Sequence, residues 1–175
     1  MRQAPKYALF ENERRFLIGQ CPDLSSTTFR TIEDLYITGS RLRLRAITHN
    51  DGRPAEFKFC KKYPSDDNRS GPVVNIYLAA DEYRTLSQLP GKTIRKRRYL
   101  REFADSVFSL DIFEVELAGL ALSEVEAPSV GALDAIPVPP WTLHEVTDDA
   151  FFRGANLAET SASDLRTKLL SLGLA

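Results

Sequence analysis

Stretches in which apolar and polar residues alternate account for most of the chain. Successive side chains of a strand point to opposite faces, so this alternation predicts strands with one apolar and one polar face. Turn-forming residues separate several of these stretches, at Thr38–Ser40, Asn50–Gly52, Pro64–Pro72 and Ala104–Ser106. The pattern predicts eight strands, at Ala8–Ile18, Thr31–Thr38, Arg41–Thr48, Ala55–Tyr63, Val73–Leu78, Thr93–Glu102, Val107–Phe113 and Ala121–Ala127.

Helices are expected in three places. Ala80–Leu89 follows a strand and is stopped by a Pro-Gly pair, and Ser129–Ile136 precedes a run of prolines. Ser161-Ala162-Ser163-Asp164 resembles a capping box, which places a helix at about 161–172. Many short strands with few helices predict a mainly β fold (α+β), either an antiparallel barrel or a sandwich.

Composition limits the class of protein without identifying its chemistry. A chain of 175 residues is long enough for one domain with a sizeable core. The 23 basic and 24 acidic side chains nearly cancel, so binding to nucleic acid or to a membrane is not expected from net charge. With no long apolar run and no N-terminal signal segment, we expect a cytoplasmic protein. Two cysteines and two histidines make a disulfide framework or a zinc site improbable.

Charged side chains lie two or four residues apart, and so on one face, in five of the predicted strands. Residues two apart in a strand share a face and lie about 6.5–7 Å apart. Each of these strands therefore has one charged face, formed by Glu11 and Glu13; by Arg41, Arg43 and Arg45; by Lys58 and Lys62; by Lys96 and Arg98; or by Glu124 and Glu126. The lysine register is open by one residue, which would replace Lys58 and Lys62 with Lys61.

The simplest interpretation is that each charged face is exposed to solvent. Against it, five strands carry charges in this way, and their other faces are largely Leu, Phe, Val or Ile. If helices cover the apolar faces, the charged faces point into a closed barrel, and eight strands leave room there for one small ligand. Buried like charges need counterions. Basic rows would then bind a polyanion, and clustered carboxylates would bind cations, as phosphate chains with Mg²⁺ or Mn²⁺ require.

The basic segment Lys92–Arg101 offers a competing interpretation as a nucleic-acid patch. In a strand, however, its charges divide between two faces and form no continuous stripe. No interleaved aromatic residues provide a stacking surface. We therefore expect no nucleic-acid partner.

The order of these motifs resembles the CYTH family, the triphosphate tunnel metalloenzymes. Glu11-Asn12-Glu13-Arg14-Arg15 resembles the Glu-x-Glu-x-Lys strand that opens the family's domain. The later segments that resemble the family follow in its order: Arg41–Arg45, Lys58–Lys62, Ile94–Tyr99, Leu110–Phe113, Ala118–Glu126 and Glu145–Asp149. The resemblance covers about residues 6–158, so residues 1–175 are expected to form a single CYTH-like domain ending in the helix at about 161–172.

The resemblance implies a closed eight-stranded antiparallel β-barrel, or tunnel, with a few helices packed outside. Members of the family include inorganic tripolyphosphatases, thiamine triphosphatases, RNA triphosphatases and a class of adenylate cyclase. The expected function is metal-dependent hydrolysis of a linear triphosphate, most of all inorganic tripolyphosphate. The alternatives are a non-catalytic polyphosphate or nucleotide-phosphate binder, a thiamine triphosphatase, and an adenylate cyclase. We expect a monomer or a homodimer with no membrane partner.

Roles follow from matching residues to the family's motifs. The expected ligands of Mg²⁺ or Mn²⁺ are Glu11, Glu13, Asp111, Glu124 and Glu126. The four glutamates and Lys58 are the expected catalytic residues. Phosphate binding is expected from Arg15, Arg41, Arg43, Arg45, Lys58, Lys62, Lys96 and Arg98.

The chain departs from the family's pattern at two places. Arg15 stands where the opening motif has lysine, and arginine is a poor proton acceptor because it stays protonated. Asn75 and Tyr77 stand where relatives often carry Glu-x-Glu. Loss of those carboxylates is the reason to keep a non-catalytic binder as an alternative.

Overall fold

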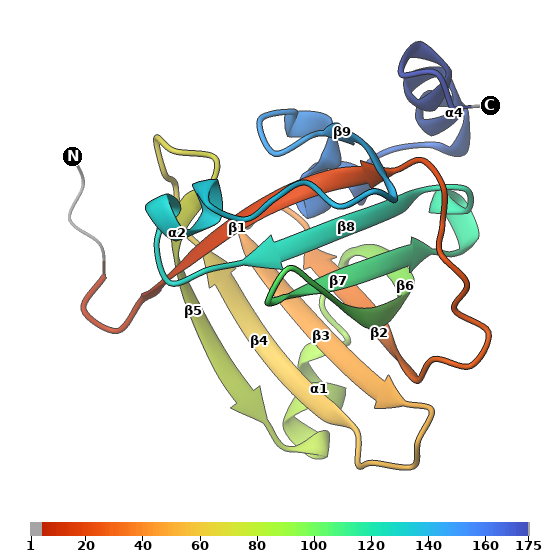
Figure 1. The fold of residues 1–175 in the computed structure, drawn as a ribbon. Coiled ribbons are helices and arrows are strands. Elements are labelled where there is room, and N and C mark those ends of the chain that lie inside the picture. Colours follow the sequence, from red (N-terminus) through yellow and green to blue (C-terminus); the bar gives the residue numbers. More distant parts are fainter. Residues whose placement is uncertain (1–4, 175) are drawn as a thin grey trace.

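Nine strands and several short helices make up residues 5–174, the part of the chain that the computed structural model describes (Figure 1). The eight predicted strands are confirmed, and a ninth was not predicted. The strands are β1 Leu9–Ile18, β2 Phe29–Ile37, β3 Leu42–His49, β4 Glu56–Lys62, β5 Ser70–Leu78, β6 Gly91–Phe103, β7 Ser106–Phe113, β8 Ala121–Glu126 and β9 Thr142–Glu145.

The sheet is antiparallel and closes on itself, as predicted. Its strand order is β5-β4-β3-β2-β6-β7-β8-β1-β9, and pairing of β5 with β1 completes an eight-stranded barrel. The β1–β5 pairing that closes the barrel is short, and it runs from Leu9 opposite Val73 to Asn12 opposite Ser70. Along the second half of β1, from Phe16 to Ile18, β9 pairs with the strand. The last residues of β5 therefore extend past the start of β1, and Asn75 and Tyr77 are exposed there.

The turn between β6 and β7 shows how local sequence fixes strand register. Phe103 pairs with Ser106, which leaves Ala104 and Asp105 as a two-residue hairpin loop. Both loop residues have positive φ, 47° and 58°. Such turns match the right-handed twist of the strands, and aspartate tolerates this conformation better than most residues.

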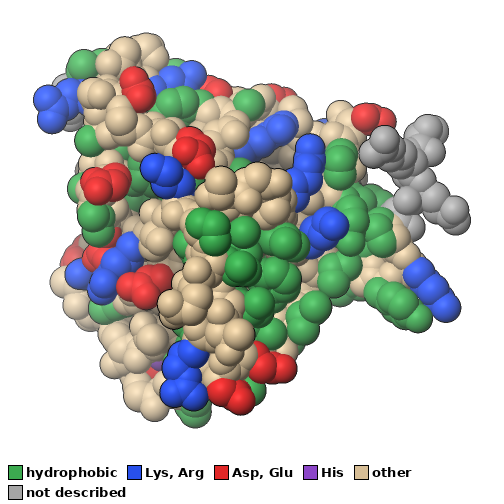
Figure 2. Space-filling model, turned by 180° about the vertical axis from the view of Figure 1, so that it is seen from behind, with side chains coloured by type: hydrophobic (Ala, Val, Ile, Leu, Met, Phe, Trp, Pro, Cys, Tyr) green, Lys and Arg blue, Asp and Glu red, His purple; other side chains and the backbone are tan. Residues whose placement is uncertain are grey.

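Two apolar clusters flank the barrel and leave its middle to charged residues. One lies on the outer side of β1, β7 and β8, where Phe16, Phe108 and Leu110 pack against Leu133 and Trp141. The other fills one end of the barrel, and it joins the strand residues Leu17, Ile94, Phe113 and Leu122 to Phe152, Leu157 and Leu165 of the C-terminal segment. On the face seen in Figure 2, apolar side chains gather between charged ones, which fits strands whose charged faces point inward.

The three predicted helices are confirmed as α1 Ala80–Leu86, α2 Val130–Asp134 and α4 Ala162–Ser171. Ser161 caps α4, and its hydroxyl accepts a hydrogen bond from the backbone N–H of Asp164 at 3.1 Å. The short helices η1 Val115–Leu117, η2 Ala150–Phe152 and α3 Gly154–Leu157 were not predicted, because three or four residues show no helical period. Among residues 5–174, no helix has the length and apolar character needed to span a membrane.

Candidate active site: a charged cavity inside the barrel

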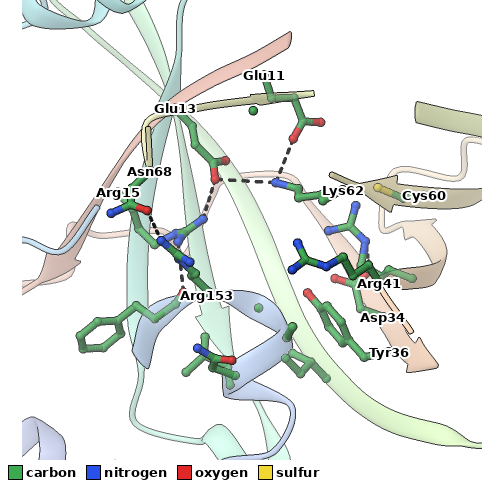
Figure 3. A pocket seen from close by; sticks show the side chains of 18 of the residues that line it. Glu11, Glu13, Arg15, Asp34, Tyr36, Arg41, Cys60, Lys62, Asn68 and Arg153 are labelled. Carbon is green, nitrogen blue, oxygen red and sulfur yellow. Dashed lines mark hydrogen bonds and ion pairs between the residues drawn. The ribbon is translucent and has the colours of Figure 1, made fainter. Parts of the chain in front are cut away.

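A cavity of about 680 Å³ occupies the interior of the barrel (Figure 3). Strand alternation turns the charged faces toward it, so that acidic and basic strands share one space. Of the residues predicted for the site, those that line the cavity are Glu11, Glu13, Arg15, Arg41, Arg43, Arg45, Lys62, Lys96, Arg98, Glu124 and Glu126.

Lys58 does not line the cavity, although it is paired opposite Arg45 of β3. It shares the face of β4 that carries Lys62, but four residues of strand separate the two by about 13 Å. Its ammonium group lies 3.4 Å from Glu56 and 4.8 Å from the ring centroid of Tyr77. Lys61 lies over the ring of Tyr63 and does not line the cavity. Of the three lysines of β4, Lys62 lines the cavity.

Asp111 is fully buried in the barrel wall and does not line the cavity. Its carboxylate accepts hydrogen bonds from Lys96 and Arg98, each at 2.5 Å. Burial opposes ionisation, but the two cations outweigh it and lower the pKa of Asp111. With its oxygens engaged in this way, Asp111 fixes the positions of Lys96 and Arg98.

Asp34 has the same role on β2, the strand on the other side of β6, and was missed in the sequence. It is 2% exposed, and its carboxylate accepts two hydrogen bonds from Arg45 at 2.6 and 2.7 Å. Arg43 lies 3.6 Å away. Burial would raise the pKa of Asp34, but Arg45 and Arg43 hold it well below its usual range. Asp34 shares its face of β2 with Ile32 and Tyr36. Because that face has no repeating charges, the sequence pattern did not identify Asp34 as a site residue.

Arg15 links three parts of the structure. Its guanidinium donates to Glu124 at 2.8 Å, to Glu13 at 2.8 Å and to the backbone carbonyl of Phe152 at 3.2 Å. Burial tends to lower the pKa of Arg15, but the carboxylates of Glu124 and Glu13 raise it above its ordinary value. Arg15 is therefore permanently charged, and it positions carboxylates without accepting protons.

Some cavity cations keep free hydrogen-bonding capacity. Within residues 5–174, Arg41 has no carboxylate within ion-pair distance, and the buried Nε of Arg43 has no hydrogen-bond partner. A buried donor without a partner costs about 1–3 kcal/mol, so an acceptor that enters the cavity relieves this cost. The cavity is thus prepared for an anion beside β3.

Carboxylates gather on the neighbouring strands β1 and β8, where Glu13 is paired opposite Glu126. In the described part of the chain, no three Asp, Glu, His or Cys side chains are grouped as a ready metal site. Three of these carboxylates have cationic partners: Lys62 binds Glu11 at 2.9 Å, and Arg15 binds Glu13 and Glu124. Burial and the charges of Glu11, Glu13 and Glu124 raise the pKa of Glu126. The donor set suits a hard divalent cation, but binding one requires these ion pairs to rearrange.

Replacing Glu126 by glutamine should therefore stabilise the metal-free protein at neutral pH. A carboxyl whose pKa is higher in the folded state destabilises the fold above that pKa and has no such effect below its unfolded value. We expect Glu126→Gln to raise Tm in EDTA at pH 7, with the gain vanishing below about pH 4. Thermal melting at several pH values tests this. An equal gain at all pH values, or a loss at pH 7, would contradict it.

Fold and cavity together define a class of protein in which a closed antiparallel barrel encloses a site for a polyanion. The chain is 39% identical over 152 residues to a protein named inorganic triphosphatase from Nitrosomonas europaea, a match that covers 85% of this chain and 96% of the relative. A crystal structure described as an inorganic triphosphatase matches with a TM-score of 0.57 at 25% identity, covering 86% of this chain and 95% of its own. Another, described as a hypothetical protein, gives 0.57 at 27% identity over 86% and 99%.

No protein-family model matches the chain. The extent and identity of the match to the Nitrosomonas protein nevertheless show the family. The chain belongs to the CYTH family of triphosphate tunnel metalloenzymes.

Proposed function

We propose that the protein hydrolyses a linear triphosphate, inorganic tripolyphosphate, inside the barrel cavity with the help of Mg²⁺ or Mn²⁺. The observation that carries the proposal is the sorting of charge in one cavity, with Arg41 and the unpaired Nε of Arg43 on one side and carboxylates of β1 and β8 on the other. The name of the Nitrosomonas relative supports the choice of inorganic triphosphate.

The proposed reaction transfers a terminal phosphoryl group to water. The water oxygen forms a new bond to phosphorus, the bond to the bridging oxygen breaks, and orthophosphate and pyrophosphate leave. Arg41 and Arg43 bind phosphate oxygens, since guanidinium groups match phosphate in geometry and charge. Lys96 and Arg98, held by Asp111, stabilise the charge that develops on the phosphate oxygens.

The proposed metal ligands are Glu11, Glu13, Glu124 and Glu126. A divalent cation bound there supplies positive charge to the phosphate oxygens and lowers the pKa of bound water. Glu11 is bound by Lys62, and Glu13 and Glu124 are bound by Arg15. Glu126 is repelled by the charges of the other three carboxylates. An entering polyanion attracts those cations and so frees the carboxylates, which couples triphosphate binding to metal binding.

Binding without turnover is the second candidate function. It is favoured by Arg15, which cannot accept a proton, and by the ion pairs that occupy the carboxylates. The earlier reason for it is weaker, because Asn75 and Tyr77 do not line the cavity. Thiamine triphosphate hydrolysis and cyclisation of ATP are further alternatives that the same assay can include.

The test is phosphate release from tripolyphosphate by protein stripped of metal with EDTA. We expect turnover when Mg²⁺ or Mn²⁺ is added back and none in EDTA, with slower release from thiamine triphosphate and ATP. Tripolyphosphate at 100 times its Kd should also stabilise the fold by about 2.7 kcal/mol. Stabilisation without phosphate release with either metal across pH 6–10 would favour the non-catalytic binder and refute hydrolysis.

A further inference from the structure

Arg153 lines the cavity although it comes from outside the barrel strands (Figure 3). It lies between η2 and α3, next to the buried Phe152, which is 1% exposed. Its own carbonyl accepts hydrogen bonds from the N–H groups of Asn156 and Leu157, both at 2.9 Å. These anchors hold the backbone in place, and the side chain both lines the cavity and is exposed to solvent, which places it at the cavity mouth.

The guanidinium of Arg153 has a neutral partner. It donates to the side-chain carbonyl of Asn68, which belongs to the loop between β4 and β5, and the amide of Asn68 donates to Asp148 at 3.0 Å. No carboxylate of residues 5–174 lies within ion-pair distance of Arg153. The neighbouring Arg69 differs, because it pairs with Asp67 at 3.4 Å and with Asp134 at 3.0 Å.

We propose that Arg153 is a substrate-binding residue that grips the triphosphate at the cavity mouth. This rests on the proposed function of the same cavity. A phosphate group matches the guanidinium in charge and can accept two of its hydrogen bonds at once, whereas the carbonyl of Asn68 is neutral and accepts one. A phosphate oxygen therefore replaces the Asn68 carbonyl as the acceptor of Arg153 when the anion enters. Asn68 holds the guanidinium over the mouth while the cavity is free of substrate.

A purely structural role is the competing explanation. In that case the Arg153–Asn68 contact joins the loop before β5 to the C-terminal segment, and either partner is equally needed. Substitution of each partner separates the two roles. Arg153→Ala removes the cation, whereas Asn68→Ala breaks the contact and leaves the cation in place.

The experiment measures the Kd of tripolyphosphate by calorimetry in EDTA, and KM and kcat with Mg²⁺. We expect Arg153→Ala to raise Kd and KM about ten-fold or more, with a smaller change in kcat, and Arg153→Lys to recover part of the loss. Asn68→Ala should bind as tightly as the wild type or more tightly. Arg166→Ala, an exposed arginine of α4, is the matched control and should change nothing.

Each outcome bears on the proposal. Unchanged binding by Arg153→Ala would overturn it, and so would equal weakening by Asn68→Ala, which would indicate the structural role. Wild-type protein that binds tripolyphosphate without turnover would refute hydrolysis and leave the Arg153 proposal to the binding data. Wild-type protein that does not bind tripolyphosphate would refute both.

Discussion

Replacing Glu11 by glutamine should lower tripolyphosphate turnover on the order of 10²–10³-fold while the fold stays intact. Although burial favours the neutral form, Lys62 lowers the pKa of Glu11, so the residue is a carboxylate at neutral pH. Glu11→Gln keeps the shape of the side chain and removes the charge that the proposed metal site needs. Its cavity partner is Lys62, so fewer contacts are lost than at Glu124, which binds both Arg15 and Arg98.

The control for this change is Glu116→Gln. Glu114-Val115-Glu116 repeats the Glu-x-Glu spacing, but Glu116 is exposed on η1 and does not line the cavity. Initial rates and thermal melting of both variants are the measurements. If Glu11→Gln turns over at the wild-type rate, or Glu116→Gln loses as much activity, the assigned carboxylate does not act in the reaction.

Replacing Asp34 by asparagine should destabilise the fold by about 3–5 kcal/mol, the usual cost of leaving buried charges without their partner. Asp34 is 2% exposed and binds Arg45, with Arg43 beside it. Both arginines would remain charged and buried in the variant. Urea unfolding at pH 7 measures the loss, and Asp66→Asn, at an exposed position, is the control.

The effect of Asp34 has a defined pH dependence. Because its pKa is lower in the folded state, its contribution is present above the ordinary value of 3.8 and is lost as the pH falls. The difference between wild type and Asp34→Asn should therefore shrink in acid. A difference of less than about 1 kcal/mol at pH 7 would show that Asp34 does not hold the two arginines in place.

Strand pattern and parity made much of the fold and the site predictable. Alternation located the eight barrel strands, and shared parity identified the inward faces of residues such as Glu13, Arg43 and Arg98. These features are local, because side-chain direction in a strand depends on residue number alone. The capping residues before α4 were predictable for the same reason.

The position of each inward side chain along the barrel axis could not be predicted. Strand tilt and stagger set that position, and neither can be read from the sequence. Lys58 shares the inward face and still does not line the cavity, whereas Asp111 is fully buried against Lys96 and Arg98, which line it. The pairing of Arg15 with Glu124 on the neighbouring strand depends on that stagger too. Arg153 was missed because it lies beside a four-residue helix with no periodic signal, in a segment placed by the burial of Phe152 and Leu157.

Binding inside the barrel is tested most directly by a crystal structure with tripolyphosphate and Mn²⁺. We expect the anion inside the barrel, in contact with Arg41 and Arg43, and an anomalous manganese peak beside Glu11 and Glu13. We also expect Lys62 to have left Glu11. Tripolyphosphate on the outer face of β6, beside Arg95 and Arg97, with the ion pairs of the cavity unchanged, would show that the cavity is not the binding site.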